Sequence, residues 1–170
     1  GMAGILRETP LTAEQLEYLE IIQNSAQSLL RIINDILDFS KIEAGKMDLD
    51  FHDFDLESLV EDTVEFFALS AEEKGVELLS LVLPGVPPLL RGDESRLRQV
   101  LINLLGNALK FTASGEVSLR ATLEREDPNQ AWVRFEVRDS GIGIPRDLVH
   151  KLFQPFTQVD GSSTRRFGGT

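Results

Sequence analysis

The sequence contains no cysteine. Without thiols the chain can form neither disulfides nor cysteine-ligated metal sites. A lack of disulfides is typical of proteins of the cytoplasm. We therefore expect a cytoplasmic location, although a longer parent protein can carry a membrane anchor of its own.

Long apolar runs and an excess of basic charge are also missing. No stretch reaches the roughly 18 apolar residues that a membrane-spanning helix needs, and no signal-peptide pattern opens the chain. We expect no membrane span within it. The formal net charge is −11, which argues against nucleic acid as a partner, because nucleic-acid-binding proteins present a basic surface.

The N-terminal part of the chain predicts one long helix. Thr9-Pro10-Leu11 interrupts any preceding helix, and Thr12 with Gln15 forms a capping box. Apolar residues then recur every three or four positions, and we expect the helix to end near Ala44 with Gly45 beyond it. The apolar stripe permits two interpretations: packing on its own domain, or half of a helical hairpin that dimerises into a four-helix bundle.

The remaining residues alternate strand and helix patterns. The predicted elements are a strand over 47–51, a helix over 56–74, a strand over 76–83, a helix over 94–111, and a hairpin that pairs 115–125 with 131–139. This order predicts an α+β fold in which the helices cover one face of a sheet. We expect the boundary between the long helix and this domain near Gly45.

The stretch Asp139-Ser-Gly-Ile-Gly-Ile-Pro145 follows the last predicted strand. An aspartate held at a strand end can accept a hydrogen bond from an exocyclic amine. Gly141 and Gly143 allow the backbone to take positive φ and to approach a flat ligand closely. Taken alone, the stretch fits a plain turn equally well.

Three polar residues share one face of the predicted helix over 94–111. Asn103, Asn107 and Lys110 are four and three residues apart. An asparagine oxygen is a reasonable Mg²⁺ ligand, and Mg²⁺ bridges phosphates. A lysine adds a compact positive charge. The alternative is a helix with two exposed asparagines.

Four stretches in order resemble the N, G1, F and initial G2 boxes of sensor histidine kinases, most closely the hybrid kinases of phosphorelays. These stretches are Asn103–Thr112, Asp139–Pro145, Phe153–Phe156 and Arg165–Thr170. In addition, Ile32–Gly45 is similar to the second helix of the dimerisation hairpin in that family. The resemblance implies a two-layer α/β sandwich of the Bergerat type, as in the GHKL superfamily of gyrases, mismatch-repair proteins and heat-shock chaperones.

The resemblance also implies ATP and Mg²⁺ as cofactors, and it assigns roles to ten residues. Asn107 is the metal ligand, Asn103 and Lys110 serve the phosphates, and Asp139 reads the adenine amine. The other implied nucleotide-binding residues are Gly141 and Gly143 in the turn, Phe156 under a mobile loop over 157–170, and Arg165, Gly168 and Gly169 within that loop.

The implied reaction is transfer of the γ-phosphoryl group to a histidine, followed by relay to an aspartate of a response-regulator receiver domain. Related ATPases that hydrolyse ATP carry a glutamate four residues before the metal-binding asparagine, and this chain has Asn103 there. Without that base, transfer is favoured over hydrolysis. The alternatives are an ATP-hydrolysing conformational switch and a nucleotide-binding or dimerisation fragment without catalysis. The implied assembly is a homodimer through the helix over 12–44.

The chain departs from the family at both ends. The phosphoacceptor box, His-Glu-x-x-Arg-Thr-Pro, is absent, and we expect His52 and His150 to be surface residues. After Thr170 the family continues, but the chain stops. We therefore expect 1–45 to be part of the dimerisation hairpin without its first helix. We expect 46–170 to be the ATP-binding domain, truncated in its G2 box, and the fragment to be inactive in autophosphorylation.

Overall fold

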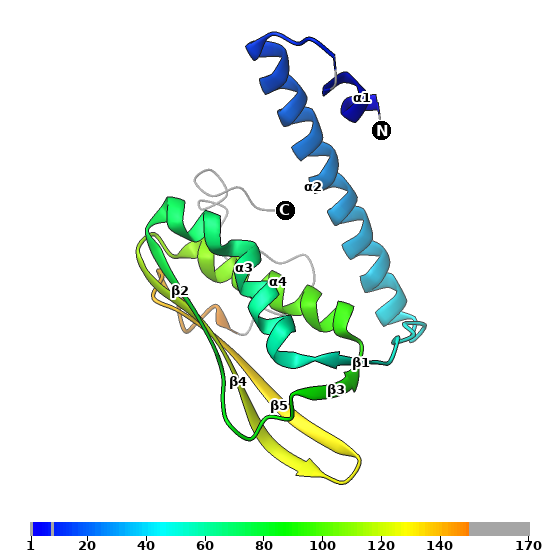
Figure 1. The fold of residues 1–170 in the computed structure, drawn as a ribbon, viewed down its shortest axis with the longest axis vertical. Coiled ribbons are helices and arrows are strands. Elements are labelled where there is room, and N and C mark those ends of the chain that lie inside the picture. Colours follow the sequence, from blue (N-terminus) through cyan, green and yellow to red (C-terminus); the bar gives the residue numbers. More distant parts are fainter. Residues whose placement is uncertain (1, 8, 150–170) are drawn as a thin grey trace. The chain divides into compact units, whose positions relative to one another are not determined.

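The computed structural model describes residues 2–7 and 9–149. The chain divides into two compact units: the first ends at Asp48 and the second begins at Leu49. Each unit is described by itself below (Figure 1).

The first unit contains α1 (Met2–Arg7) and the long helix α2 (Ala13–Glu43). The capping box is present: Thr12 Oγ1 accepts from the Gln15 N–H at 3.2 Å, and Gln15 Oε1 accepts from the Thr12 N–H at 2.9 Å. These bonds satisfy two of the donors that a helix start leaves unpaired. At the other end Gly45 has φ of 62°. Both predicted ends of this helix are thus confirmed.

Much of the apolar surface of α2 is uncovered. Exposed side chains include Leu16, Ile22, Leu29, Ile33 and Ile36, of which Ile22 and Leu29 are each 58% exposed. Within the part of the chain that the structure describes, no helix is both long enough and apolar enough to traverse a bilayer.

The second unit is built on a three-stranded sheet in the order β2-β4-β5. Strand β2 (Val76–Val82) pairs in parallel with β4 (Gly115–Asp127), and β4 pairs antiparallel with β5 (Gln130–Asp139). The last pair of the second ladder joins Val117 to Asp139. A separate two-stranded ribbon pairs β1 (His52–Asp55) with β3 (Leu89–Gly92).

Two helices cover one face of the three-stranded sheet (Figure 1). They are α3 (Leu56–Lys74) and α4 (Glu94–Phe111), whose N-caps are Asp55 and Asp93. Buried residues of both layers form the main core: Val60, Ala71, Val76, Leu101, Leu105, Ala108, Leu109, Val117 and Leu119. Each leucine buried in this way contributes about 1.5–3 kcal/mol. The predicted α+β arrangement of helices on one sheet face is confirmed.

One strand prediction is wrong and one strand was not predicted. Residues 47–51 alternate apolar and polar side chains, but they lie outside any strand, and Leu49 and Phe51 are more than half exposed. The strand begins instead at His52, because that is where the backbone finds a partner in β3. That partner strand, which the sequence patterns did not predict, follows Pro88 directly.

Candidate nucleotide-binding site

Asp139 is the last residue of β5 and is exposed. Its Oδ1 accepts a hydrogen bond from the Gly141 N–H at 3.0 Å. One carboxylate oxygen is therefore held by the turn that follows the strand. The other oxygen, Oδ2, has no hydrogen bond recorded among residues 2–7 and 9–149. This arrangement leaves one charged acceptor for an outside donor.

The turn after Asp139 packs against the C-terminal end of α4. The Ile142 nitrogen lies 3.4 Å from the carbonyl oxygen of Phe111, the last residue of that helix. A side chain at Gly141 would place its Cβ only 2.4 Å from the same oxygen. Glycine is required there because of this close approach and not because of positive φ, which corrects the sequence interpretation for Gly141.

Gly143 behaves as predicted, with φ of 68° and open space around it. Beyond it the Leu148 N–H donates to the Pro145 carbonyl at 2.9 Å, which forms a turn.

Helix α4 carries the predicted phosphate-binding and metal-binding face. Asn103 and Asn107 are exposed and Lys110 is half-buried, while the leucines of the opposite face are in the core. At 1.5 Å per residue, Asn107 lies about 6 Å and Asn103 about 12 Å along the helix axis from Phe111. The Asp139 turn thus meets α4 at the end nearer to Asn107 and Lys110, whereas Asn103 lies close to the middle of the helix.

The C-terminal end of α4 is tied to its neighbours. Lys74 Nζ of α3 donates to the Leu109 carbonyl at 2.9 Å. This bond satisfies an acceptor that the helix end leaves open and places a cation where the helix dipole is negative. Lys110 Nζ lies over the Phe111 ring, 5.4 Å from its centroid. The sequence reasoning did not identify Lys74, because its contact spans 35 residues without a local pattern.

The opposite end of α4 is fixed by charge. Hydrogen bonds from the Arg96 N–H, the Ser95 hydroxyl and the Asp50 N–H lower the pKa of the Asp93 carboxyl to about 2. Glu94 pairs with Arg98 at 2.7 Å, and this bond lowers the pKa of Glu94 and raises that of Arg98. These groups cap and stabilise the N-terminal end of the helix, and they lie far from its Phe111 end.

Most of the other residues named in the sequence analysis lie beyond the part of the chain that the structure describes. His150, Phe156, Arg165, Gly168 and Gly169 lie outside the described residues, as does the loop over 157–170. The His52 side chain is 45% exposed, and its Nε2 lies 3.5 Å from Glu94 Oε2, a partner that the sequence did not reveal. Across residues 2–7 and 9–149, no group of three or more His, Cys, Asp or Glu side chains could hold a metal ion.

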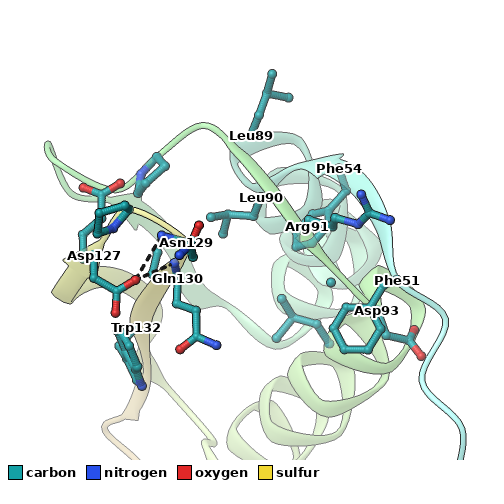
Figure 2. A pocket seen from close by; sticks show the side chains of 16 residues that line it. Phe51, Phe54, Leu89, Leu90, Arg91, Asp93, Asp127, Asn129, Gln130 and Trp132 are labelled. Atoms are coloured by element: carbon teal, nitrogen blue, oxygen red, sulfur yellow. Dashed lines mark hydrogen bonds between the residues drawn. The ribbon is translucent and has the colours of Figure 1, made fainter.

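A cavity of about 780 Å³ lies elsewhere in the second unit, between the β1–β3 ribbon and the β4–β5 turn (Figure 2). Figure 2 shows Trp132 and Asp127 on one side and Phe51, Phe54 and Arg91 on the other. Asp127 Oδ1 accepts from the N–H groups of the next residues of its own turn. The cavity is at the far end of β5 from Asp139, roughly 30 Å along the strand. It is therefore separate from the candidate site.

Two family models match the sequence. The model described as "Histidine kinase-, DNA gyrase B-, and HSP90-like ATPase" matches residues 92–170, which include α4 and the Asp139 turn. The "His Kinase A (phospho-acceptor) domain" model matches residues 1–45. The chain belongs to the histidine kinase family.

Curated histidine kinases similar to the chain are much longer than it. Hybrid signal transduction histidine kinase L of Dictyostelium discoideum is 50% identical over 170 residues, which are 100% of this chain and 10% of that protein. Sensor protein GacS of Pseudomonas syringae pv. syringae is 48% identical over 170 residues, 100% of this chain and 19% of its own length. The chain spans between a tenth and a fifth of these two relatives.

Solved histidine kinase structures share the fold. Full-length ShkA in complex with AMPPNP is 38% identical with a TM-score of 0.77, over 96% of this chain and 34% of that one. Histidine kinase ThkA in complex with response regulator protein TrrA is 28% identical with a TM-score of 0.60, over 97% of this chain and 48% of that one. The histidine kinase resemblance and the α+β fold that it implied are confirmed.

Proposed function

We propose that the chain is the catalytic portion of a hybrid-type sensor histidine kinase of a two-component system. Its parent protein binds Mg-ATP, transfers the γ-phosphoryl group to one of its own histidines, and passes it to an aspartate of a response-regulator receiver domain. The observation that carries this proposal is the packing of the Asp139 turn on the helix that bears Asn103 and Asn107. The AMPPNP complex of ShkA supports a ligand of the ATP class.

Asp139 selects the base in this proposal. With Oδ1 engaged by the Gly141 N–H, Oδ2 accepts a hydrogen bond from the exocyclic amine of adenine. A charged acceptor strengthens such a bond. Gly141 allows the turn to lie close to Phe111. The positive φ of Gly143 allows the backbone to turn beside the bound nucleotide.

The exposed face of α4 serves the phosphates. Asn107 would contribute an oxygen ligand to Mg²⁺, which would supply charge neutralisation for the phosphates. Asn103 donates to phosphate oxygens, and Lys110 adds a positive charge that an acidic chain needs near a polyanion. Outside the described residues, Phe156, Arg165, Gly168 and Gly169 complete the proposed nucleotide site.

The proposed reaction is phosphoryl transfer. A histidine nitrogen attacks the γ-phosphorus, the bond from that phosphorus to the bridging oxygen breaks, ADP leaves and the imidazole proton is lost. An asparagine amide does not accept a proton from water at neutral pH, so Asn103 provides no general base for hydrolysis. The proposed role of the chain is therefore to orient the nucleotide and to neutralise the charge of its phosphates, which is most of what this reaction requires of a protein.

The assembly and its placement complete the proposal. Residues 1–45 belong to a dimerisation and phosphotransfer hairpin, and 46–170 to the ATP-binding domain. The exposed stripe on α2 supports a homodimer, because large apolar surfaces on a helix are stabilised by a second copy. The location is cytoplasmic.

The test supplies a phosphoacceptor in trans. The chain is incubated with γ-labelled ATP, Mg²⁺ and a purified helical hairpin that carries the family's histidine box, beside an Asn107→Ala variant. We expect acid-labile phosphate on the hairpin from the chain and none from the variant. Release of inorganic phosphate at the same rate with and without the hairpin would instead favour an ATP-hydrolysing switch.

A further inference from the structure

Ser140, the residue next to Asp139, ties the turn to the start of β4. Its Oγ accepts from the Glu116 N–H at 2.9 Å, and its own N–H donates to the Glu116 carbonyl at 3.0 Å. The hydroxyl hydrogen has two carbonyls within reach, those of Glu116 at 3.2 Å and Ser114 at 3.5 Å. The side chain thus extends the β4–β5 ladder by one step beyond its last pair, Val117 with Asp139.

Gly115 provides the room for this hydroxyl. A Cβ at Gly115 would lie 2.2 Å from Ser140 Oγ and 3.3 Å from Ser140 Cβ. The first distance is shorter than any non-bonded contact tolerates. Gly115 also has φ of 108°, which side-chain-bearing residues rarely adopt. Two residues 25 positions apart are therefore fitted to each other.

The turn after Asp139 contacts two elements, strand β4 and helix α4. Ser140 fastens it to β4, and Ile142 meets the Phe111 carbonyl of α4. Asp139 lies between the ladder and these contacts, and its Oδ1 is oriented by the Gly141 N–H. A carboxylate at a strand end without such contacts would share the mobility of an exposed terminus.

We propose that Ser140 is a positioning residue for nucleotide recognition, and that its bonds to the Ser114–Glu116 backbone, in the space left by Gly115, fix the direction of the Asp139 carboxylate. The inference rests on the proposed function, in which Asp139 selects adenine. Guanine carries a carbonyl where adenine carries its amine, so a fixed carboxylate accepts from one base and repels the other. Base selectivity therefore depends on Ser140.

The experiment measures Mg-ADP affinity with a ribose-labelled fluorescent ADP, and Mg-GDP affinity by competition, in the whole chain. We expect Ser140→Ala to weaken Mg-ADP binding about three- to tenfold, the loss that corresponds to one neutral hydrogen bond. Mg-GDP affinity should fall less, so the preference for Mg-ADP over Mg-GDP becomes smaller. Ser140→Thr retains the hydroxyl and should restore the ratio, and the control Ser118→Ala, on strand β4, should leave it unchanged.

A double-mutant cycle tests the link to Gly115. If Gly115→Ala acts by displacing the Ser140 hydroxyl, its effect on Mg-ADP affinity should largely disappear in the Ser140→Ala background. Amide hydrogen exchange of the nucleotide-free chain gives a second readout: the Gly141 and Ile142 amides should exchange faster in Ser140→Ala. Additive effects in the cycle, or unchanged exchange, would overturn the proposal.

The outcomes separate this inference from the function on which it rests. A chain that binds Mg-ADP, with a Ser140→Ala variant that binds both nucleotides as the chain does, refutes the role of Ser140 alone. A variant that loses thermal stability but keeps its base selectivity also refutes it. Failure of the unmodified chain to bind Mg-ADP refutes both.

Discussion

The backbone nitrogen of Ile142 lies 3.4 Å from the carbonyl oxygen of Phe111. This contact joins the turn that follows strand β5 to the end of helix α4, 31 residues earlier in the chain. Each segment by itself has an ordinary structural explanation. Together they place a charged acceptor, Asp139, at the end of a helix whose exposed face bears two asparagines.

Gly141 and Gly143 should respond differently to alanine. In Gly141→Ala the new Cβ meets the Phe111 carbonyl at 2.4 Å, so the turn must move away from α4. We expect a loss of about 1–3 kcal/mol in the free energy of unfolding together with weaker Mg-ADP binding.

Gly143→Ala is the matched comparison, because its surroundings are open and only its positive φ is strained. Its cost should be about 1 kcal/mol. Urea unfolding of both variants measures the difference. Equal costs, or a larger one at Gly143, would contradict the close packing of Gly141 on α4.

Asn107 should determine the Mg²⁺ dependence of nucleotide binding. Removing Mg²⁺ should weaken ATP binding by the chain, and in Asn107→Ala the affinity with Mg²⁺ should fall about tenfold toward the metal-free value. Titration with and without a chelator measures this. Asn129→Ala, at the far end of β5, is the control that should behave as the unmodified chain. An Asn107→Ala variant that keeps its full response to Mg²⁺ would show that the metal is held elsewhere.

Asp93 should make stability pH-dependent in acid. Its pKa is about 2 in the folded chain and about 3.9 in an unfolded one, so the unfolded state binds more protons between these values. The stabilisation is complete above about pH 4 and is lost as the pH falls toward 2. Asp93→Asn keeps a capping oxygen but does not titrate.

The measurement for Asp93 is the difference in free energy of unfolding between the chain and Asp93→Asn from pH 6 down to pH 2. We expect the advantage of the aspartate to shrink in the acid part of this range. A difference that stays constant throughout would mean that the cap bonds do not depend on the carboxylate charge.

The stripe on α2 should mediate self-association. Leu29 and Ile22, seven residues apart, are exposed in the single chain, and in a helical bundle they would be buried at a seam. Leu29→Glu places a charge there and should raise the dissociation constant of the dimer about a hundredfold or more. Gln27→Glu adds the same charge at a position outside the stripe and should have little effect.

Light scattering at high protein concentration measures this directly. We expect the unmodified chain at a mass above the 19.0 kDa of one copy, and Leu29→Glu at the mass of one copy. A monomeric unmodified chain would contradict the proposed dimer.

Helix ends were predictable because their signals are local. Thr12 and Gln15 cap each other three residues apart, and Asp55 and Asp93 each bond an N–H three residues on. Strand β3 was not predictable in this way. Its four residues form a strand because β1 pairs with them, and that pairing joins positions such as Phe54 and Leu90 that no local pattern connects.

In the candidate site, too, features set by local sequence were predictable and features set by the packing of distant segments were not. The motif placed Asp139 correctly at a strand end, since alternation up to Arg138 marks the strand. It assigned the wrong reason to Gly141, because the approach of Phe111 depends on how α4 packs on the sheet. Ser140 carried no signal, since its fit to Gly115 arises only when β4 and β5 are paired.

Calorimetric titration with Mg-ADP, run on the chain and on Asp139→Asn side by side, shows whether the Asp139 carboxylate binds the adenine amine. Asparagine can keep the bond from the Gly141 N–H, but its remaining group is then an NH₂, which faces the adenine amine donor to donor. We predict binding by the chain and a loss of roughly 10- to 100-fold in the variant, equivalent to a charge-assisted hydrogen bond. Equal binding by both proteins would mean that Asp139 does not bind the adenine amine.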